Sequence, residues 1–258
     1  ILMLIPSLCW GETLEKVIAD ANLYTVKIDV STEIEDQKGL SQIYSSLVDG
    51  FKYVFTSQTI SAVIVITIFM NLLLFPYMQM VTVVSKEVLN VGPLLMGILM
   101  ASDGMGALIG SIGIASQDRM KYHGRIYLYG SLLSLGALFV FSSSSIYFIS
   151  LVLLLFLGIG TSGFGTMQST IVLLVSKPEL RGRALGVVTI AIGAGPIGSL
   201  IIGAVSEWIG SSSALMINSV LGFILVAASG FLMPSIRGQI LPATVSNQPT
   251  RSGSITKV

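Results

Sequence analysis

One carboxylate lies inside a long apolar stretch of the sequence, which makes it the strongest candidate for chemistry. Asp103 occurs in "LLMGILMASDGMGALIGSIG", and it is the only charged residue between Glu87 and Asp118. A charged side chain in the middle of a membrane span costs at least about 2.5 kcal/mol and usually faces a cavity. Asp103 could therefore bind a coupling proton or cation. The alternative is a structural residue that faces water or packs against a neighbouring helix.

Side-chain amides occur in other apolar stretches as well, and two of them are candidates for contact with a substrate or an ion. Asn71 lies in "FMNLLLF" and Gln168 in "TMQSTIV". Both can contact a substrate or an ion, so they are further candidates for the lining of a cavity. An amide within a span more often forms a hydrogen bond to a neighbouring helix, which is the structural alternative.

Sites for catalysis, metals or nucleotides are not supported by the composition. The chain has one cysteine, Cys9, and one histidine, His123, so neither an internal disulfide nor a multi-histidine metal site is available. A nucleotide-binding loop of the GxxxxGK[ST] kind does not occur. The formal net charge of +1 gives no reason to expect a nucleic-acid partner. We expect no enzyme activity, no cofactor and no metal.

The composition as a whole is that of a membrane protein. Hydrophobic residues make up 53% of the 258 residues, charged residues only 10%, and the mean hydropathy is +0.86. About 20 apolar residues span a bilayer as a helix, in which every backbone group is hydrogen-bonded within the segment. Six stretches meet this requirement, at about 59–78, 93–116, 126–142, 146–174, 184–206 and 212–233. Pro76 should kink or end the first of them.

The remaining segments divide the chain into four parts. Residues 1–10 have the character of the end of a preceding membrane helix, and the chain is expected to be a fragment. Residues 11–57 are mixed in charge and form a predicted cytoplasmic loop with an amphipathic segment before the first span. Residues 58–234 contain the six spans. Residues 235–258, rich in Ser, Thr, Pro and Gly, are predicted to be a disordered cytoplasmic tail.

Basic residues predict the orientation of the spans. Of the 14 Lys and Arg residues, every one except Lys86 precedes the first span, follows the sixth, or lies in the connection after the second or the fourth. Basic residues near span ends are retained on the cytoplasmic side. Both ends of the chain are therefore predicted to be cytoplasmic, in a protein of the cell membrane.

The connection after the fourth span, "SKPELRGRALG", carries more than retention signals require. Glu179 can lie near the start of a helix, at the positive end of its dipole, and Arg181 and Arg183 can pair with carboxylates on neighbouring helix ends. These residues are candidates for a cytoplasmic latch between helices. The alternative is a solvated turn whose basic residues only orient the chain.

Glycine spacing predicts close helix contacts. Gly106 and Gly110 are four residues apart in "GMGALIGSIG", and Gly195 precedes Pro196 in "GAGPIGSLIIGA". Small residues at such spacing let two helix backbones approach, and a proline after glycine bends a helix. We expect these two helices to pack against helices outside the chain.

The chain resembles the C-terminal half of a major facilitator superfamily transporter, in the branch of the enterobactin exporters and multidrug-efflux proteins. The resemblance runs from about Leu47 to Pro234. Its best stretches are "LVDGFKYVF", "NLLLFPYMQM", "LLMGILMASDGMGALIGSIGIA", "GRIYLYGSLL" and above all "PELRGRALGVVTIAIGAGPIGSLIIGAVSEWIGSSSAL". It implies an all-α membrane protein in which the six spans are helices seven to twelve of a twelve-helix fold, arranged as inverted 3+3 repeats.

A second charged loop follows from the resemblance. The stretch "QDRMKYHGR" is similar to the charged loop of the superfamily, with Asp118 and Arg119 separated from Arg125 by a longer spacing than usual. Asp118, Arg119 and Arg125 are therefore added to the candidate latch. A solvated turn that carries retention signals is the alternative here as well.

The resemblance also implies a function. It indicates a secondary active transporter that works by alternating access, with proton-coupled efflux of amphipathic, drug-like or siderophore-like molecules. The implied partners are the bilayer, an N-terminal six-helix half, a small-molecule substrate and protons. Uptake or lipid flipping by the same fold is the main alternative, and a membrane scaffold without transport is a further one.

Overall fold

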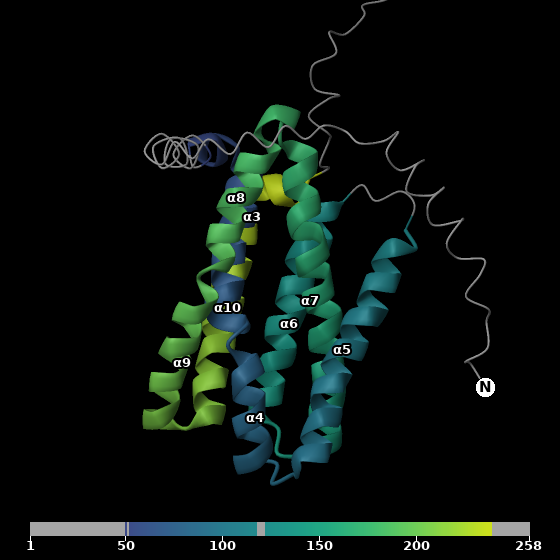
Figure 1. The fold of residues 1–258 in the computed structure, drawn as a ribbon, viewed down its shortest axis with the longest axis vertical. Helices are drawn as coiled ribbons and strands as arrows, with labels where there is room; N and C mark the ends of the chain where they lie inside the picture. Colours follow the sequence, from purple (N-terminus) through teal and green to yellow (C-terminus); the bar gives the residue numbers. More distant parts are fainter. Residues whose placement is uncertain (1–49, 51, 118–121, 239–258) are drawn as a thin grey trace, which may run out of the picture. The chain divides into compact units, whose positions relative to one another are not determined.

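The computed structural model of the chain describes residues 50, 52–117 and 122–238 (Figure 1). These belong to one compact unit, residues 43–258. Every regular element in the described ranges is a helix. The elements are α3 (Gln58–Phe69), η2 (Met70–Leu74), α4 (Tyr77–Glu87), α5 (Pro93–Ala115), α6 (His123–Ser143), α7 (Tyr147–Val175), η3 (Pro178–Leu180), α8 (Arg181–Ile192), α9 (Gly195–Ile209), α10 (Ser211–Leu232) and η4 (Pro234–Ile236).

Six helical segments in the described ranges are long and apolar enough to cross a membrane. They cover 58–87, 93–115, 123–143, 147–175, 178–209 and 211–232. Each corresponds to one of the six predicted stretches, so the all-α, six-span fold class is confirmed. Apolar stretches of this length cannot leave backbone groups unpaired in lipid, which is why hydropathy alone places them.

The first span continues past Pro76, which was expected to kink or end it. η2 is a π-helical turn in which the Phe75 N–H donates to the Met70 carbonyl oxygen, five residues back, at 3.1 Å. Such a wide turn inserts one extra residue and accommodates Pro76, which has no N–H to donate. The helix then resumes as α4 and reaches Glu87.

The fifth span is also interrupted. α8 ends at Ile192 and α9 starts at Gly195, with Pro196 in its first turn. The break lies beside η2, because a Cβ atom at Gly198 would overlap the Leu72 carbonyl group. The two discontinuous spans therefore pack against each other close to their irregular turns.

α7 is the helix on which its two neighbours pack, as Figure 1 shows for α5 and α6. A Cβ atom at Gly130 of α6 would lie 2.8 Å from the Gly160 carbonyl oxygen of α7. α5 approaches the other side of α7 through Gly106, where a Cβ atom would overlap the Leu155 carbonyl oxygen. Glycine on both interfaces brings the three backbones into contact.

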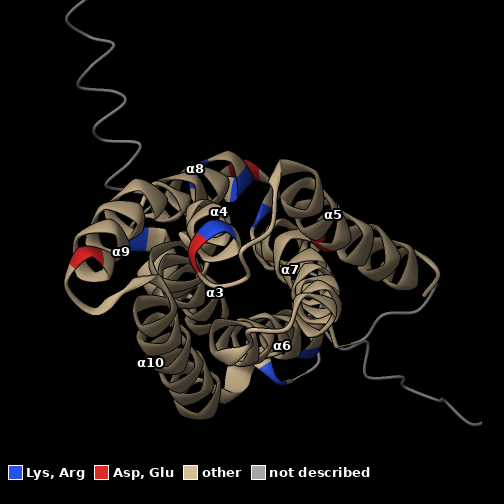
Figure 2. Cartoon of the chain, turned by 90° about the horizontal axis from the view of Figure 1, so that it is seen from below, with Lys and Arg blue, Asp and Glu red and all other residues tan. Residues whose placement is uncertain are grey.

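Charged residues are few in the described helices (Figure 2), and, apart from Asp103, they lie near helix ends or in the connections. Lys177, Arg181 and Arg183 lie in the connection that ends α7 and starts α8, and Arg125 lies in the first turn of α6. The opposite ends carry Lys86 with Glu87. We refer to the first set of helix termini as the basic end.

Candidate functional site

The Asp103 carboxylate meets a tyrosine from another span in the middle of the fold. Tyr77 Oη donates a hydrogen bond to Asp103 Oδ2 at 2.9 Å. Tyr77 is the first residue of α4, directly after Pro76, and only 4% of it is exposed. Asp103 Oδ1 is buried and has no hydrogen-bond partner in the described part of the chain. One oxygen atom of the carboxylate thus accepts a hydrogen bond, and the other has no partner among the described residues.

The backbone around Asp103 is held against α7. A Cβ atom at Gly158 would overlap the Asp103 carbonyl oxygen, so the two helices touch at this level. The neighbouring Ser102 donates from Oγ to the Leu151 carbonyl oxygen at 2.7 Å. The backbone at Asp103 is therefore held by α7, while the hydrogen bond of its carboxylate reaches across to α4.

A second polar cluster, the Thr67 network, lies between α3, α6 and α7. Tyr127 Oη donates to the Val63 carbonyl oxygen at 2.9 Å, so its single proton is used. The Thr67 hydroxyl, 3.0 Å from Tyr127 Oη, must then be the donor in that contact. Gln168 Nε2 in turn donates to Thr67 Oγ1 at 2.9 Å. The chain of donors runs from Gln168 through Thr67 and Tyr127 to the Val63 carbonyl.

Asn71 joins the same network from η2. Its Nδ2 atom donates to the Thr67 carbonyl oxygen at 2.9 Å. Asn71 and Gln168 are 6% and 5% exposed, so both amides are buried in protein. The structure thus brings two of the three predicted cavity residues together. In the residues described, no hydrogen bond joins them to Asp103.

Aromatic rings pack beside the network. The Tyr127 and Phe164 rings are stacked with centroids 5.3 Å apart, and Phe75 lies 5.9 Å from Phe164. Tyr127 is fully buried and Phe164 is 2% exposed. The rings exclude water from the hydrogen bonds of the network, which strengthens them.

Comparison with known families decides the class of the chain. Residues 20–249 match the model of the family described as transmembrane secretion effector, a branch of the major facilitator superfamily. The chain belongs to this family. No curated protein matches the chain. The fold and the family together identify a multi-pass membrane transporter.

The predicted latch residues of the transporter are only partly within the described ranges. Asp118 and Arg119 lie outside them. Glu179, Arg181 and Arg183 are exposed around the η3–α8 junction, and in the described residues no ion pair joins Glu179 to Arg181 or Arg125.

Arg125 has partners of another kind. Its Nε atom donates to the Arg237 carbonyl oxygen at 3.0 Å, and its guanidinium carbon lies 4.3 Å from the centre of the Tyr122 ring. Arg125 therefore connects the start of α6 to the segment that follows α10.

The predicted packing glycines have neighbours within the chain. Gly110 lies against Ser162 and Ile159 of α7, as Gly106 lies against Leu155. The expectation that these two glycines meet a helix outside the chain is therefore wrong. Gly195 is in ordinary contact with Asn71, at 3.9 Å for an added Cβ atom. Pro196 is exposed.

Several residues that build the site were missed from the sequence. Tyr77, Thr67 and Tyr127 supply its hydroxyl groups, and Gly158 and Gly198 supply its closest backbone contacts. A tyrosine in an apolar stretch was an available signal, because a buried phenol needs a hydrogen-bond partner. The glycines gave no comparable signal, since their partners are distant in sequence.

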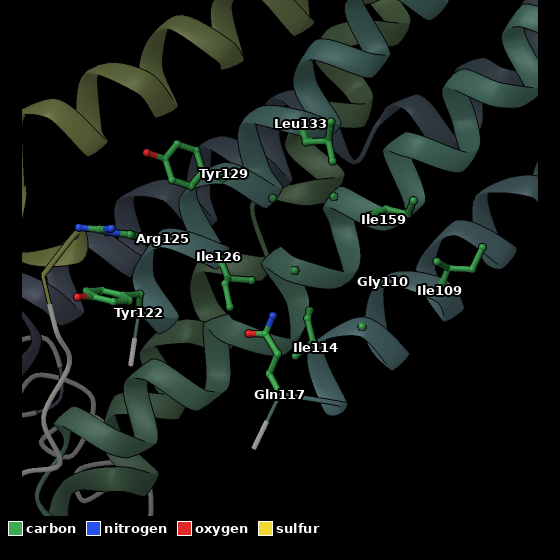
Figure 3. Close-up of a pocket in the computed structure, with 14 residues that line it drawn as sticks. Ile109, Gly110, Ile114, Gln117, Tyr122, Arg125, Ile126, Tyr129, Leu133 and Ile159 are labelled. Carbon is green, nitrogen blue, oxygen red and sulfur yellow. The ribbon is translucent and has the colours of Figure 1, made fainter. Parts of the chain in front are cut away.

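Of the cavities that open at the surface in the described part of the transporter, two are larger than the one of about 410 Å³ between α6 and α10. A cavity of about 670 Å³ is lined by Gln79, Gly195, Pro196, Ser199 and Leu200, between α4 and α9. A second, of about 790 Å³, lies between α5, α6 and α7 near the basic end (Figure 3). The described residues contain no group of three His, Cys, Asp or Glu side chains placed to hold a metal.

Proposed function

We propose that the chain is the C-terminal half of a secondary active transporter that exports amphipathic small molecules in exchange for protons, by alternating access. The observation that carries this proposal is the Asp103 carboxylate, with one oxygen bonded to Tyr77 and the other buried without a partner. Of the described residues, Asp103 is the only acidic one in the middle of a span.

A proton can bind at the unpartnered oxygen. A buried acceptor without a hydrogen bond is costly, and a buried negative charge more so. Protonation of Asp103 Oδ1 removes the charge, while Oδ2 can keep the hydrogen bond from Tyr77. The group therefore offers two states of charge at a fixed place in the fold, as a coupling residue needs.

The location of Tyr77 connects this proton to a movable part of the transporter. Tyr77 follows the η2–Pro76 irregularity, which packs against the interrupted α8–α9 span through Gly198. Discontinuous spans are where transporters bend, because their backbone is not locked by a continuous hydrogen-bond ladder. A change of charge at Asp103 alters the contact between α5 and the start of α4, and so biases the arrangement of these spans.

The nature of the spans supports an amphipathic substrate. Apart from Asp103, no charged side chain lies in the middle of a described span, so fixed charges for a phosphate or a sugar acid are lacking there. The cavity between α4 and α9 offers the amide of Gln79 and the hydroxyl of Ser199 beside apolar carbon. Drug-like or siderophore-like molecules with few polar groups fit such a surface.

Topology and partners complete the proposal. The basic end would face the cytoplasm of a cell, with both chain termini on that side, because basic residues are retained there. An N-terminal six-helix half would supply the other wall of the substrate pathway. We further propose that Asn71 and Gln168 hold the helices together, since their amides are buried and bonded to Thr67.

Proton-driven flux in vesicles tests the proposal. The full-length protein would be reconstituted into liposomes with a pH gradient, and the movement of a fluorescent amphipathic dye measured with and without a protonophore. We expect dye movement that collapses with the gradient and requires Asp103, as shown by Asp103→Asn. Glu207→Gln is the matched control, because Glu207 is an exposed acid near the end of α9. Dye flux that does not depend on the pH gradient would contradict the proposal. Wild-type flux in the Asp103→Asn variant would contradict it as well.

A further inference from the structure

The cavity between α5, α6 and α7 is divided into a polar part and an apolar part. Figure 3 shows Gln117, Tyr122 and Arg125 at the basic end of α5 and α6. The rest of its lining is aliphatic or glycine, for example Ile109 and Leu133, apart from Tyr129. Its volume of about 790 Å³ lies within the range of about 300 to 1,000 Å³ that is usual for small-molecule sites.

Glycine creates the cavity. Gly110 on α5 and Gly160 on α7 remove side chains where the helices meet, and both also line the cavity. Gly113, one turn beyond Gly110, meets nothing within 4 Å of an added Cβ atom. The space at Gly113 is therefore not needed for packing within the chain, and a ligand can enter it.

The cavity opens where lipid can reach it. Ile109 of α5 and Leu133 of α6 line the cavity, and they are 51% and 42% exposed. Both belong to spans, so the surface around the opening is apolar at membrane depth. A lipid chain can enter from the bilayer without crossing water.

The Arg125 guanidinium is positioned to hold an anion at the polar end. Its Nε–H group donates to the Arg237 carbonyl oxygen and its plane lies over the Tyr122 ring, which together fix its orientation. Both Nη atoms remain available in the described part of the chain, where Arg125 forms no ion pair. The lining residues include no acid. Arginine with two free nitrogen atoms binds phosphate oxygens in pairs.

The positive end of a helix dipole lies at the same place. α6 starts at His123, two residues before Arg125, and runs 21 residues away from the basic end. The N-terminus of a helix of this length favours a negative charge within its first turn. Basic pockets between spans near a membrane surface are where anionic lipid head groups bind.

We propose that this cavity is a binding site for one anionic phospholipid of the leaflet at the basic end. The phosphate binds Arg125, and one acyl chain lies between α5 and α6 against Gly110, Gly113 and Gly160. The ligand matches the site in charge at one end and in hydrophobicity along the rest. Occupancy separates α5 from α6 while both stay in contact with α7.

Lipid retention by the purified full-length protein tests this site. The protein would be delipidated in detergent, titrated with phosphatidylglycerol or phosphatidylcholine, and the bound lipids counted by native mass spectrometry. We expect one tightly held phosphatidylglycerol and weaker binding of phosphatidylcholine. Arg125→Gln loses the charge-assisted hydrogen bonds to the phosphate, so the affinity for phosphatidylglycerol should fall about tenfold or more. Arg181→Gln, at the same end but outside the cavity, should bind like the wild type.

Filling the cavity gives a second, independent test. Gly113→Phe should abolish the tight site, whereas Gly97→Phe should not, because Gly97 is an equally open position of α5 that does not line the cavity. Leu133→Trp fills the cavity from α6 and serves if Gly113→Phe does not fold. Equal binding of the two lipids, or tight binding that survives Arg125→Gln and cavity filling, would overturn the site. A bound transport dye in place of phosphatidylglycerol would assign the cavity to the substrate and also overturn it.

Discussion

The two polar clusters within the spans differ in how completely their hydrogen bonds are formed. In the Thr67 network the Gln168 amide, the Thr67 hydroxyl and the Tyr127 hydroxyl each donate a hydrogen bond, and aromatic rings pack beside them. At Asp103 one carboxylate oxygen is bonded and the other is buried without a partner. Both clusters connect spans that are distant in sequence, but in the described residues it is the Asp103 cluster that has a buried oxygen atom without a partner.

This difference gives the two clusters different roles: the Thr67 network holds the helices in one arrangement, and the Asp103 cluster can change between two states. A fully bonded buried network has nothing to gain from a proton or a movement, so it favours one arrangement of its helices. A carboxyl group with a free oxygen gains from a proton, and its single bond to Tyr77 can be broken at modest cost. The contrast leads to four tests, from the largest expected effect to the smallest.

The largest effect is expected where α7 supports the Asp103 backbone. Gly158→Leu would drive a side chain into the Asp103 carbonyl group and force α5 away from α7. We expect little folded protein, because overpacking against backbone costs about 1 to 3 kcal/mol or more. Gly165→Leu is the control on the same helix, since nothing lies within 4 Å of its Cβ position. The yield of monodisperse protein on size-exclusion chromatography measures both, and equal yields would show that the glycine contact is dispensable.

Asp103→Asn removes the negative charge at Asp103 and keeps nearly the same side-chain volume. The amide can still accept from Tyr77 but cannot carry a charge, so proton-driven flux should fall by about tenfold or more, as expected for the loss of a coupling of 1 to 3 kcal/mol. Stability should change little. Dye flux under a pH gradient, compared with exchange in its absence, measures the coupling. A variant that loses exchange and gradient-driven flux in equal proportion would mean that Asp103 serves substrate binding.

Tyr127→Phe removes a hydroxyl group from the Thr67 network instead. It leaves the Thr67 hydroxyl and the Val63 carbonyl without this partner, and we expect a loss of about 1 kcal/mol in the free energy of unfolding. Proton coupling should remain. The control is Tyr129→Phe, two residues further along α6, where the side chain is 61% exposed. Thermal unfolding in detergent with parallel flux assays measures both properties. Lost coupling with unchanged stability would reverse the roles assigned to the two clusters.

Features that depend on a short stretch of sequence could be predicted, whereas contacts between residues far apart in the sequence could not. The six spans were predicted because an apolar stretch is a local property of the chain. Asp103 was identified for the same reason, since its cost in lipid does not depend on a partner. Its bond to Tyr77 joins residues 26 positions apart, and the bonds of Thr67 to Tyr127 and Gln168 span 60 and 101 positions. These pairs depend on which face each helix turns toward its neighbour, and a single sequence does not specify this.

Interrupted spans show the same limit. Pro76 indicated an irregularity, but a π-turn that lets the helix continue depends on neighbours such as Gly198, which lets α9 approach η2. The spacing of Gly106 and Gly110 predicted a close helix contact and not its partner, which is α7. Gly158 carries the equally close contact from the other side and was not singled out, because its role exists only opposite Asp103.

The smallest effect is expected at the basic end, where polar groups are exposed and neither cluster extends. We propose that Arg181 and Arg183 act with Glu179 or Asp118 as a cytoplasmic latch that favours the state closed to the inside. Changing both arginines to lysine keeps the positive charge that orients the chain and removes only the planar, bidentate donors.

Exposed ion pairs contribute about 0 to 1 kcal/mol each, so the double lysine variant should shift the balance of inward-open and outward-open states by less than about tenfold. Transport should slow by a similar factor, while proton coupling through Asp103 is retained. Accessibility of a single engineered cysteine on the cytoplasmic side measures the balance of states, and dye flux measures the rate. If both equal those of the wild type, the turn only orients the chain, and the polar groups with a role in transport are confined to the interior of the spans.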